Sequence, residues 1–360
     1  MIADLPRSLR AATAVQRALV PQLLGRPWLC ALLAGRRTLP REGRRLDTQT
    51  AAMLALSAVD PNVDLARHPP AAARLHLAAQ VSVVDALPPP GVVTVDHRVD
   101  GPAGAVPVRL YTAPAAIGAR DVPAIVYFHG GGWVTGSIAT HDSFCRRLAV
   151  GARCRVVSVD YRLAPEHPFP AAIDDAVASF RWVVGQAAGL CIDPARVAVA
   201  GDSAGGSLSA VVARRTRGDA RPPALQALIY PGLDATFSAP SHATLASGYL
   251  LTRQAMDWYL DQYARGVDTR HPDLSPLLAD DLAGVAPALI YTAGFDPLRD
   301  EGRLYGERLR ELGIPARHTE LPSLIHGFVL MIGAIDAARR ATDEIIADIG
   351  RALSAVPGGG

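Results

Sequence analysis

The stretch Val197–Gly206 constrains this chain more than any other. It reads Val-Ala-Val-Ala-Gly-Asp-Ser-Ala-Gly-Gly, so an apolar run with β propensity stops at a glycine, and two more glycines after Ser203 lead into a helical pattern. A strand that turns sharply into a helix at a serine needs glycine two positions before and two after it, because a side chain there would collide with neighbouring segments. Backbone N–H groups at the start of a helix also favour negative charge. We predict a nucleophile at Ser203, with a glycine-rich helix start as the alternative.

Composition narrows the classes of function. The chain has 360 residues, of which 49% are hydrophobic and 19% charged, so it is long enough to bury a large core. A formal net charge of +2 predicts neither nucleic acid nor an acidic membrane as a partner. All 36 basic residues are arginine, which excludes Schiff-base, Ser–Lys and P-loop lysine chemistry.

The cysteines favour a reducing compartment. No two of them have C-x-x-C spacing, and none lies in a Cys/His cluster, so no metal site is predicted. Buried free thiols and a cytoplasmic location are expected, while a Cys145–Cys154 disulfide stays open.

An apolar segment near the N-terminus needs separate attention. Ala14–Gly35 is fairly apolar but is interrupted by arginine and proline, and no stretch reaches the roughly 18 uninterrupted apolar residues of a membrane span. No apolar core followed by a small-residue cleavage site is present either. We predict an amphipathic helix that packs on the body of the protein, without stable membrane insertion, and keep contact with lipid as the alternative.

The predicted secondary structure changes near residue 90. Residues 1–90 predict helical pieces broken by prolines, and Leu87–Gly91 reads as a boundary. From residue 91 to 360 short β-rich runs alternate with helical patterns, which predicts a mostly parallel sheet between helices. An insertion at 234–278 is expected to join the N-terminal helices over the site.

The individual elements follow from these patterns. The first two strands are expected to form an antiparallel edge. The expected strands are 92–99, 106–111, 124–128, 155–160, 197–200, 224–230, 288–293 and 316–321. The expected helices are 9–24, 48–59, 71–84, 141–150, 170–187, 203–215, 253–264, 297–312 and 328–353.

A serine nucleophile needs a base, and the base needs an acid. Asp296 follows the strand 288–293, and His326 follows the last predicted strand. The carboxyl ends of parallel strands share one edge of a sheet, so these side chains can meet Ser203 there in the chain order Ser, acid, His. Asp300 is a weaker candidate for the acid, because it lies a helical turn beyond the end of the strand. His318 is a weaker candidate for the base, because it lies within a strand.

A second glycine-rich loop, His129–Trp133, directly follows the strand 124–128. Its three glycines allow free backbone N–H groups to pass close to the nucleophile, where they can stabilise an oxyanion. We predict an oxyanion hole made by the N–H groups of Gly131, Gly132 and Ala204. A phosphate-binding loop is a poor alternative, since the chain has no lysine for it.

Four stretches together resemble the hormone-sensitive lipase family of esterases, also called bacterial family IV. They are His129–Trp133, Asp160–Pro170, Gly201–Gly206, and Ala293–Gly302 with His326–Phe328. The resemblance covers about residues 90 to 355 and implies an α/β-hydrolase fold with a mostly parallel eight-stranded sheet. It also implies a helical cap and ester hydrolysis without metal or cofactor. Ser207 departs from the asparagine expected after the elbow.

The resemblance assigns the site as well. Ser203, Asp296 and His326 fall on the family's triad, and Asp202 and Glu166 are expected to hold the elbow and the proline-rich loop. The family also implies a homodimer through the last strand, 316–321. A pocket for the ester is expected to be lined by Trp133, Tyr249, Leu250 and Trp258.

The predicted function is therefore hydrolysis of short- to medium-chain carboxylic esters, small molecules, through an acyl-enzyme. Three alternatives stay open: hydrolysis of lactones, amides or thioesters on the same triad, a non-catalytic binding protein on the same fold, and a lipase that works at a membrane surface.

Overall fold

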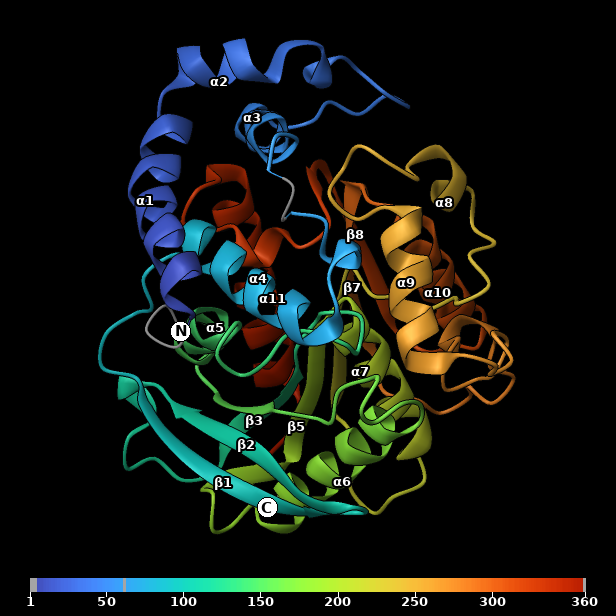
Figure 1. The fold of residues 1–360 in the computed structure, drawn as a ribbon. Helices are drawn as coiled ribbons and strands as arrows, with labels where there is room; N and C mark the ends of the chain where they lie inside the picture. Colours follow the sequence, from blue (N-terminus) through green and yellow to red (C-terminus); the bar gives the residue numbers. More distant parts are fainter. Residues whose placement is uncertain (1–4, 61–62, 359–360) are drawn as a thin grey trace.

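A mostly parallel eight-stranded sheet runs through the centre of the molecule. The computed structural model describes residues 5–60 and 63–358 (Figure 1). The strand order is β1-β2-β4-β3-β5-β6-β7-β8, with β2 antiparallel to β1 and β4 and the remaining pairs parallel. All eight predicted strands and the antiparallel edge are confirmed, and β8 forms the other edge. The strands are β1 Val93–Gly101, β2 Gly104–Thr112, β3 Val122–Phe128, β4 Arg155–Val159, β5 Ile192–Asp202, β6 Leu225–Ile229, β7 Ala288–Phe295 and β8 Ala316–Ile325.

Helices cover both faces of the sheet. Successive side chains of a strand point to opposite faces, and along β3 both are buried: Tyr127 packs in the core that holds Phe144, whereas Val126 packs in the core that holds Phe180. This explains why the central strands read as nearly continuous apolar runs. Helices α5 (Asp142–Gly151) and α11 (Asp336–Ala355) lie on one face. Helices α6 (Ala171–Gly185), α7 (Ala204–Arg215) and α10 (Arg299–Glu311) lie on the other.

Two further groups of helices stand apart from this three-layer body. Figure 1 shows the N-terminal helices in blue at the top and left, and α8 and α9 in yellow and orange at the right. Helix α1 packs on α4, and α2 packs on α3. The bounds are α1 Arg7–Leu24, α2 Pro27–Ala34, η2 Gly35–Thr38, α3 Thr48–Ser57, η3 Leu65–Arg67 and α4 Pro70–Val84. In the rest of the chain they are η4 Pro114–Ala116, α8 Pro240–Thr244, α9 Arg253–Ala264, η5 Pro276–Leu278 and η6 Phe328–Leu330.

Two helix predictions were wrong in detail. The segment Ala14–Gly35 is two helices bent by 97°, because Gly25 closes α1 and Pro27, which has no N–H to donate, starts α2. The predicted helix 328–353 begins only at Asp336. Gly333 donates to the Val84 carbonyl at 2.9 Å, and a Cβ there would lie 2.4 Å from the Asp85 backbone, so this turn is fixed by contact with the end of α4.

The structure also bears on the membrane and the thiols. No single described helix is both long and apolar enough to cross a bilayer, and only Leu9–Leu24 and Pro27–Thr38 taken together would be, despite the bend between them. The four cysteines are free thiols, so Cys145 and Cys154 do not form the disulfide left open above.

The elbow glycines give the first prediction. A Cβ on Gly205 would lie 1.9 Å from the Phe128 carbonyl oxygen, whereas one on Gly218 meets nothing within 4 Å. Gly205→Ala must move backbone against backbone, so we expect it to lower the free energy of unfolding by about 3 kcal/mol or more. Urea denaturation measures this. Gly218→Ala is the control and should stay within about 0.5 kcal/mol of wild type; equal stabilities for the two variants would contradict the packing described.

Candidate active site

Ser203 sits on the predicted strand–turn–helix elbow between β5 and α7. Its backbone has φ +53° and ψ −121°, a conformation that residues other than glycine rarely adopt. The Ser203 N–H donates to the Ile229 carbonyl at 2.9 Å, which fixes the turn against the neighbouring strand β6. A Cβ at Gly201 would lie 2.3 Å from the Gly205 backbone. The glycine spacing in the sequence therefore reflects a turn with no room for side chains.

Three side chains far apart in the sequence form one hydrogen-bonded row. The His326 Nε2 atom lies 2.9 Å from Ser203 Oγ, and its Nδ1 atom lies 2.8 Å from Asp296 Oδ2. Asp296 is fully buried, while His326 remains slightly exposed on the cavity side. With Nδ1 protonated toward the carboxylate, Nε2 faces the serine hydroxyl as an acceptor.

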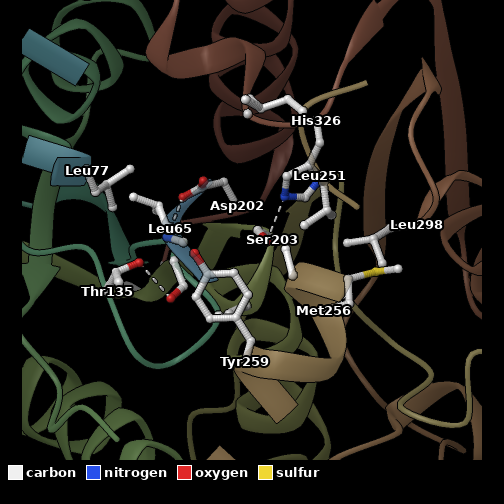
Figure 2. Close-up of a pocket in the computed structure, with 18 of the residues that line it drawn as sticks. Leu65, Leu77, Thr135, Asp202, Ser203, Leu251, Met256, Tyr259, Leu298 and His326 are labelled. Atoms are coloured by element: carbon white, nitrogen blue, oxygen red, sulfur yellow. Dashed lines mark hydrogen bonds between the residues drawn. The ribbon is translucent and has the colours of Figure 1, made fainter. Parts of the chain in front are cut away.

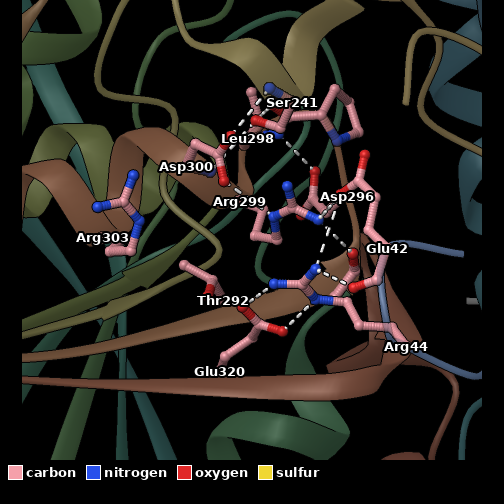
Figure 3. A network of polar contacts seen from close by, with 12 residues as sticks. Glu42, Arg44, Ser241, Thr292, Asp296, Leu298, Arg299, Asp300, Arg303 and Glu320 are labelled. Carbon is pink, nitrogen blue, oxygen red and sulfur yellow. Dashed lines mark hydrogen bonds and ion pairs between the residues drawn. The ribbon is translucent and has the colours of Figure 1, made fainter. Parts of the chain in front are cut away.

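The loop that carries Asp296 is held by its own backbone and by the N-terminal segment. Asp296 Oδ1 accepts from the Leu298 N–H at 2.9 Å. Arg299 donates to Asp300 and to Glu42 at 2.9 Å each, as Figure 3 shows. An acidic residue of the N-terminal segment thus contacts the loop of the buried acid.

The two rival residues have other partners. Asp300 accepts from the Ser241 N–H at 3.0 Å and so joins the acid loop to the 234–278 insertion. His318 Nε2 lies 2.8 Å from Thr292 Oγ1, within the sheet. Burial lowers the pKa of His318, so this imidazole is neutral at physiological pH.

The glycine loop after β3 leaves its N–H groups free. Gly131 and Gly132 have φ values of +123° and +59°, which only glycine adopts readily. Among the described residues, the N–H groups of Gly131, Gly132 and Ala204 have no hydrogen-bond partner. The first two lie beside Ser203 in the lining of one cavity, and Ala204 begins the helix that follows it.

A buried carboxylate joins this loop to the elbow. Asp202 Oδ1 accepts from the Gly130 N–H at 2.8 Å and from the Tyr127 hydroxyl at 2.6 Å, and His141 Nε2 lies 3.2 Å away. Burial opposes ionisation of Asp202, but His141 and the hydrogen bonds outweigh it and lower the pKa of the carboxyl to about 2. The ionised form holds the two loops in one arrangement.

A mostly apolar pocket of about 230 Å³, partly open to solvent, lies over Ser203. Figure 2 shows Leu65 and Leu77 from the N-terminal segment on one side and Met256 and Tyr259 from α9 on the other. Other apolar members come from the same two segments and from the loop after β8. They include Val81, Val84, Leu250, Leu251, Leu260, Leu330 and Met331.

Two of the four predicted pocket residues lie at this cavity and two do not. Trp133 and Leu250 line it. Tyr249 instead packs on Phe295, with ring centroids 5.1 Å apart, and Trp258 packs edge-on against Tyr259 in the neighbouring core. Both aromatic residues lie within segment 234–278, but which face of α9 meets the site depends on how the helix docks.

The insertion is anchored beside the same site. Buried Glu301, at the wall of the cavity, accepts from the Leu233 N–H at 2.7 Å and lies 2.9 Å from His242 Nε2. Burial raises the pKa of Glu301 to about 7. Among the described residues, no group of three or more His, Cys, Asp or Glu side chains is placed to hold a metal ion.

Comparisons with known proteins agree with this geometry. The sequence profile described as "alpha/beta hydrolase fold" matches residues 125–330. The carboxylic ester hydrolase LipN of Mycobacterium tuberculosis is 41% identical over 92% of this chain and 90% of its own length. The chain belongs to the hormone-sensitive lipase family. It is a carboxylic ester hydrolase, which sets aside a purely binding role.

Relatives across this family share its fold. The ethyl acetate hydrolase of Pseudomonas putida is 42% identical over 65% of this chain and 74% of its own length. LAE6, an α/β-hydrolase enzyme from the metagenome of Lake Arreo, has a TM-score of 0.82 at 41% identity, covering 86% of this chain and 99% of that one. The esterase of Pyrobaculum calidifontis has a TM-score of 0.74 at 37% identity, covering 82% and 97%.

Two residues beside the site of this esterase gave no signal in the sequence. Arg74 on α4 donates to the Val134 and Ala164 carbonyls at 2.8 Å each and pairs with Glu166, so it ties α4 to the glycine loop and to the proline-rich loop. Tyr259 lies against the glycine loop, since a Cβ on Gly132 would come within 2.3 Å of its ring. Neither Arg74 nor Tyr259 belongs to a sequence motif, so nothing in the sequence distinguishes them from other residues of amphipathic helices.

His129, the first residue of the glycine loop, gives a pH prediction. It is fully buried and stacks on Tyr161 with ring centroids 4.3 Å apart, and its Nδ1 lies 2.9 Å from the Gly130 carbonyl oxygen. Burial, with a contribution from His141, lowers the pKa of His129 to about 3. Between about pH 6.5 and 3 the unfolded chain therefore takes up a proton that the folded chain does not, so stability is lost as the pH falls through this window.

We expect this single group to contribute up to about 1.4 kcal/mol per pH unit to the loss of stability on acidification. Urea midpoints between pH 7 and 5 measure it, and His129→Asn should show a shallower pH slope than wild type. His167→Asn, at an exposed histidine, is the control and should keep the wild-type slope. Equal slopes for all three proteins would show that His129 is protonated in the folded state.

Proposed function

We propose that this esterase works through a Ser203–His326–Asp296 triad and an acyl-enzyme. His326, oriented by Asp296, takes the proton of the Ser203 hydroxyl as its oxygen attacks the ester carbonyl. His326 then gives the proton to the leaving alcohol, and the acyl group stays on Ser203. Water, deprotonated by His326, attacks the acyl-enzyme, and His326 returns that proton to the Ser203 oxygen as the acid leaves. The row of 2.9 Å and 2.8 Å contacts is the observation that carries this proposal.

The oxyanion of each tetrahedral intermediate would accept from the N–H groups of Gly131, Gly132 and Ala204. Their lack of protein partners supports this role, because a donor already bonded to the protein could not serve. Loss of one such donor typically costs about 10²–10³ in rate. The Lake Arreo ester hydrolase EH1AB1 has been solved in complex with a derivative of bipyridine phosphonate, and a phosphonate has the tetrahedral shape that such a hole would hold.

We further propose that residues 1–90 and 234–278 form a cap that limits the ester to short and medium acyl chains. The cavity of about 230 Å³ is smaller than the roughly 300–1,000 Å³ typical of pockets for drug-sized ligands. Leucine side chains from both segments and Met256 from the insertion line it. The name of the Pseudomonas putida relative, an ethyl acetate hydrolase, is consistent with a small ester.

Hydrolysis of a p-nitrophenyl ester series from acetate to palmitate tests nucleophile and acyl preference together. We expect kcat/KM to peak at acyl chains of about two to eight carbons and kcat to fall around 10⁶-fold in Ser203→Ala, as in another serine hydrolase. A variant that keeps a tenth of wild-type activity would contradict the nucleophile. Faster turnover of palmitate than of butyrate would contradict the cap. A lactone, an anilide and a thioester added to the series decide between the alternative bonds.

Tyr259 is proposed as a positioning residue of the oxyanion loop. Its hydroxyl interacts with the Thr135 side chain, which opposes the rise in the Tyr259 pKa caused by burial, and Thr135 Oγ1 donates to the Gly131 carbonyl at 3.0 Å. Its ring packs against Gly132, as noted above. A side chain of the insertion thus contacts Gly132 directly and reaches Gly131 through Thr135, so the packing of the insertion bears on the alignment of both donors.

Tyr259→Phe keeps the ring and removes the hydroxyl that interacts with Thr135. We expect kcat to fall about fivefold to tenfold with KM nearly unchanged, and the rate of inactivation by a p-nitrophenyl phosphonate to fall equally, since both depend on the tetrahedral geometry. Tyr263→Phe is the matched control, because the buried Tyr263 hydroxyl has no hydrogen-bond partner among the described residues. If Tyr259→Phe raises KM alone, the residue binds the substrate and does not align the loop.

A further inference from the structure

The outer face of the first two helices is apolar and uncovered. Val15 and Leu19 are 59% and 50% exposed on α1, and Trp28 and Leu32 are 66% and 71% exposed on α2. Each pair has i, i+4 spacing and so lies on one side of its helix. Leu39, just beyond η2, is 54% exposed. These five, here called the outer face, are a large share of the exposed large hydrophobic side chains in the described chain.

The inner faces of these helices are already occupied. Leu24, Cys30 and Ala34 are buried in the main core, and α1 and α2 pack on α4 and α3. The outer face is therefore not needed to hold the helices on the body. An exposed tryptophan and leucine at helical spacing on an otherwise well-packed helix indicate a surface that meets something apolar.

Charge is segregated into the same segment. Residues 5–45 contain nine arginines and one acidic residue, Glu42, and so carry a formal charge of +8; since the whole chain carries +2, the remaining residues carry −6. Arg26 directly precedes α2, and Arg36 and Arg37 directly follow it. All three are exposed, and within the described chain none forms an ion pair. The small net charge of the chain hides this separation.

We propose that the outer face binds the surface of an anionic lipid bilayer. A helix with tryptophan and leucine on its exposed side and arginine at its ends suits the boundary between lipid head groups and acyl chains, where the rings and leucines enter the apolar region and guanidinium groups reach phosphates. A second copy of this chain fits less well, because face-to-face pairing would bring two clusters of arginines together. Peripheral binding of this kind needs no helix that spans the bilayer.

Flotation of the purified full-length protein with vesicles tests the proposal without an activity measurement. The probes are vesicles of phosphatidylcholine with 30% phosphatidylglycerol, and vesicles of phosphatidylcholine alone. We expect wild type to float with the anionic vesicles at 50 mM salt, at least tenfold more weakly with neutral ones, and much more weakly with anionic ones at 500 mM salt.

Two variants and two matched controls locate the binding. Trp28→Ser/Leu32→Ser and Arg36→Gln/Arg37→Gln should each reduce flotation at least tenfold. Ile117→Ser, at a side chain 59% exposed elsewhere, and Arg339→Gln/Arg340→Gln, an exposed arginine pair on α11, should float as wild type does. Hydrolysis of soluble p-nitrophenyl butyrate should be unchanged in all four, which shows that they are folded.

Three results would overturn the proposal. Wild type that stays at the bottom of the gradient with anionic vesicles would remove the lipid partner. Equal flotation of wild type and all four variants would place binding elsewhere. A dimer seen by sedimentation that Trp28→Ser/Leu32→Ser dissociates, without any flotation, would assign the outer face to a second copy of the chain.

Discussion

The carboxylate of Asp202 is the contact on which the rest of the site depends. It lies next to the strained Ser203, yet it accepts hydrogen bonds from the glycine loop after a different strand and from Tyr127 within that strand. A buried charge is costly unless it is fully bonded, and here the neighbouring imidazole and donors keep it ionised. The nucleophile and the proposed oxyanion donors are thereby fixed relative to one another before any ester arrives, which is where electrostatic catalysis gains most.

Around this fixed centre the two helical segments add a second layer of constraint. The N-terminal segment reaches the acid loop through Glu42 and Arg299, and it reaches the glycine loop through Arg74. The insertion reaches the acid loop through Ser241 and the glycine loop through Tyr259. Each segment thus contacts both the loop that carries Asp296 and the glycine loop. Substitutions at these contact residues would change the rate of the chemical step as well as the shape of the cavity.

What the sequence predicts well is what local rules decide. The elbow can be predicted because strand, serine and glycine must stand at fixed spacing, and the central strands can be predicted because buried parallel strands are apolar on both faces. The bend at Gly25 and Pro27 could also have been read, since both are strong local signals. The start of α11 could not, because Gly333 is held outside the helix by the end of α4, about 250 residues earlier in the chain. Tyr259 and Trp258 are neighbours on one helix, and only its docking decides which of them meets the glycine loop.

The most direct test of Ser203 as the nucleophile is covalent labelling by diethyl p-nitrophenyl phosphate. A nucleophilic serine attacks this compound at phosphorus and displaces p-nitrophenol. Trypsin cleaves after arginine, and Arg196 and Arg214 flank the elbow, so Ser203 lies in the peptide 197–214. We expect release of one p-nitrophenol per chain and a diethyl phosphate group on Ser203 alone. Fragmentation of that peptide, which also holds Ser207 and Ser209, locates the group. A label on another residue, or complete inactivation without any label on this peptide, would contradict the assignment of Ser203 as the nucleophile.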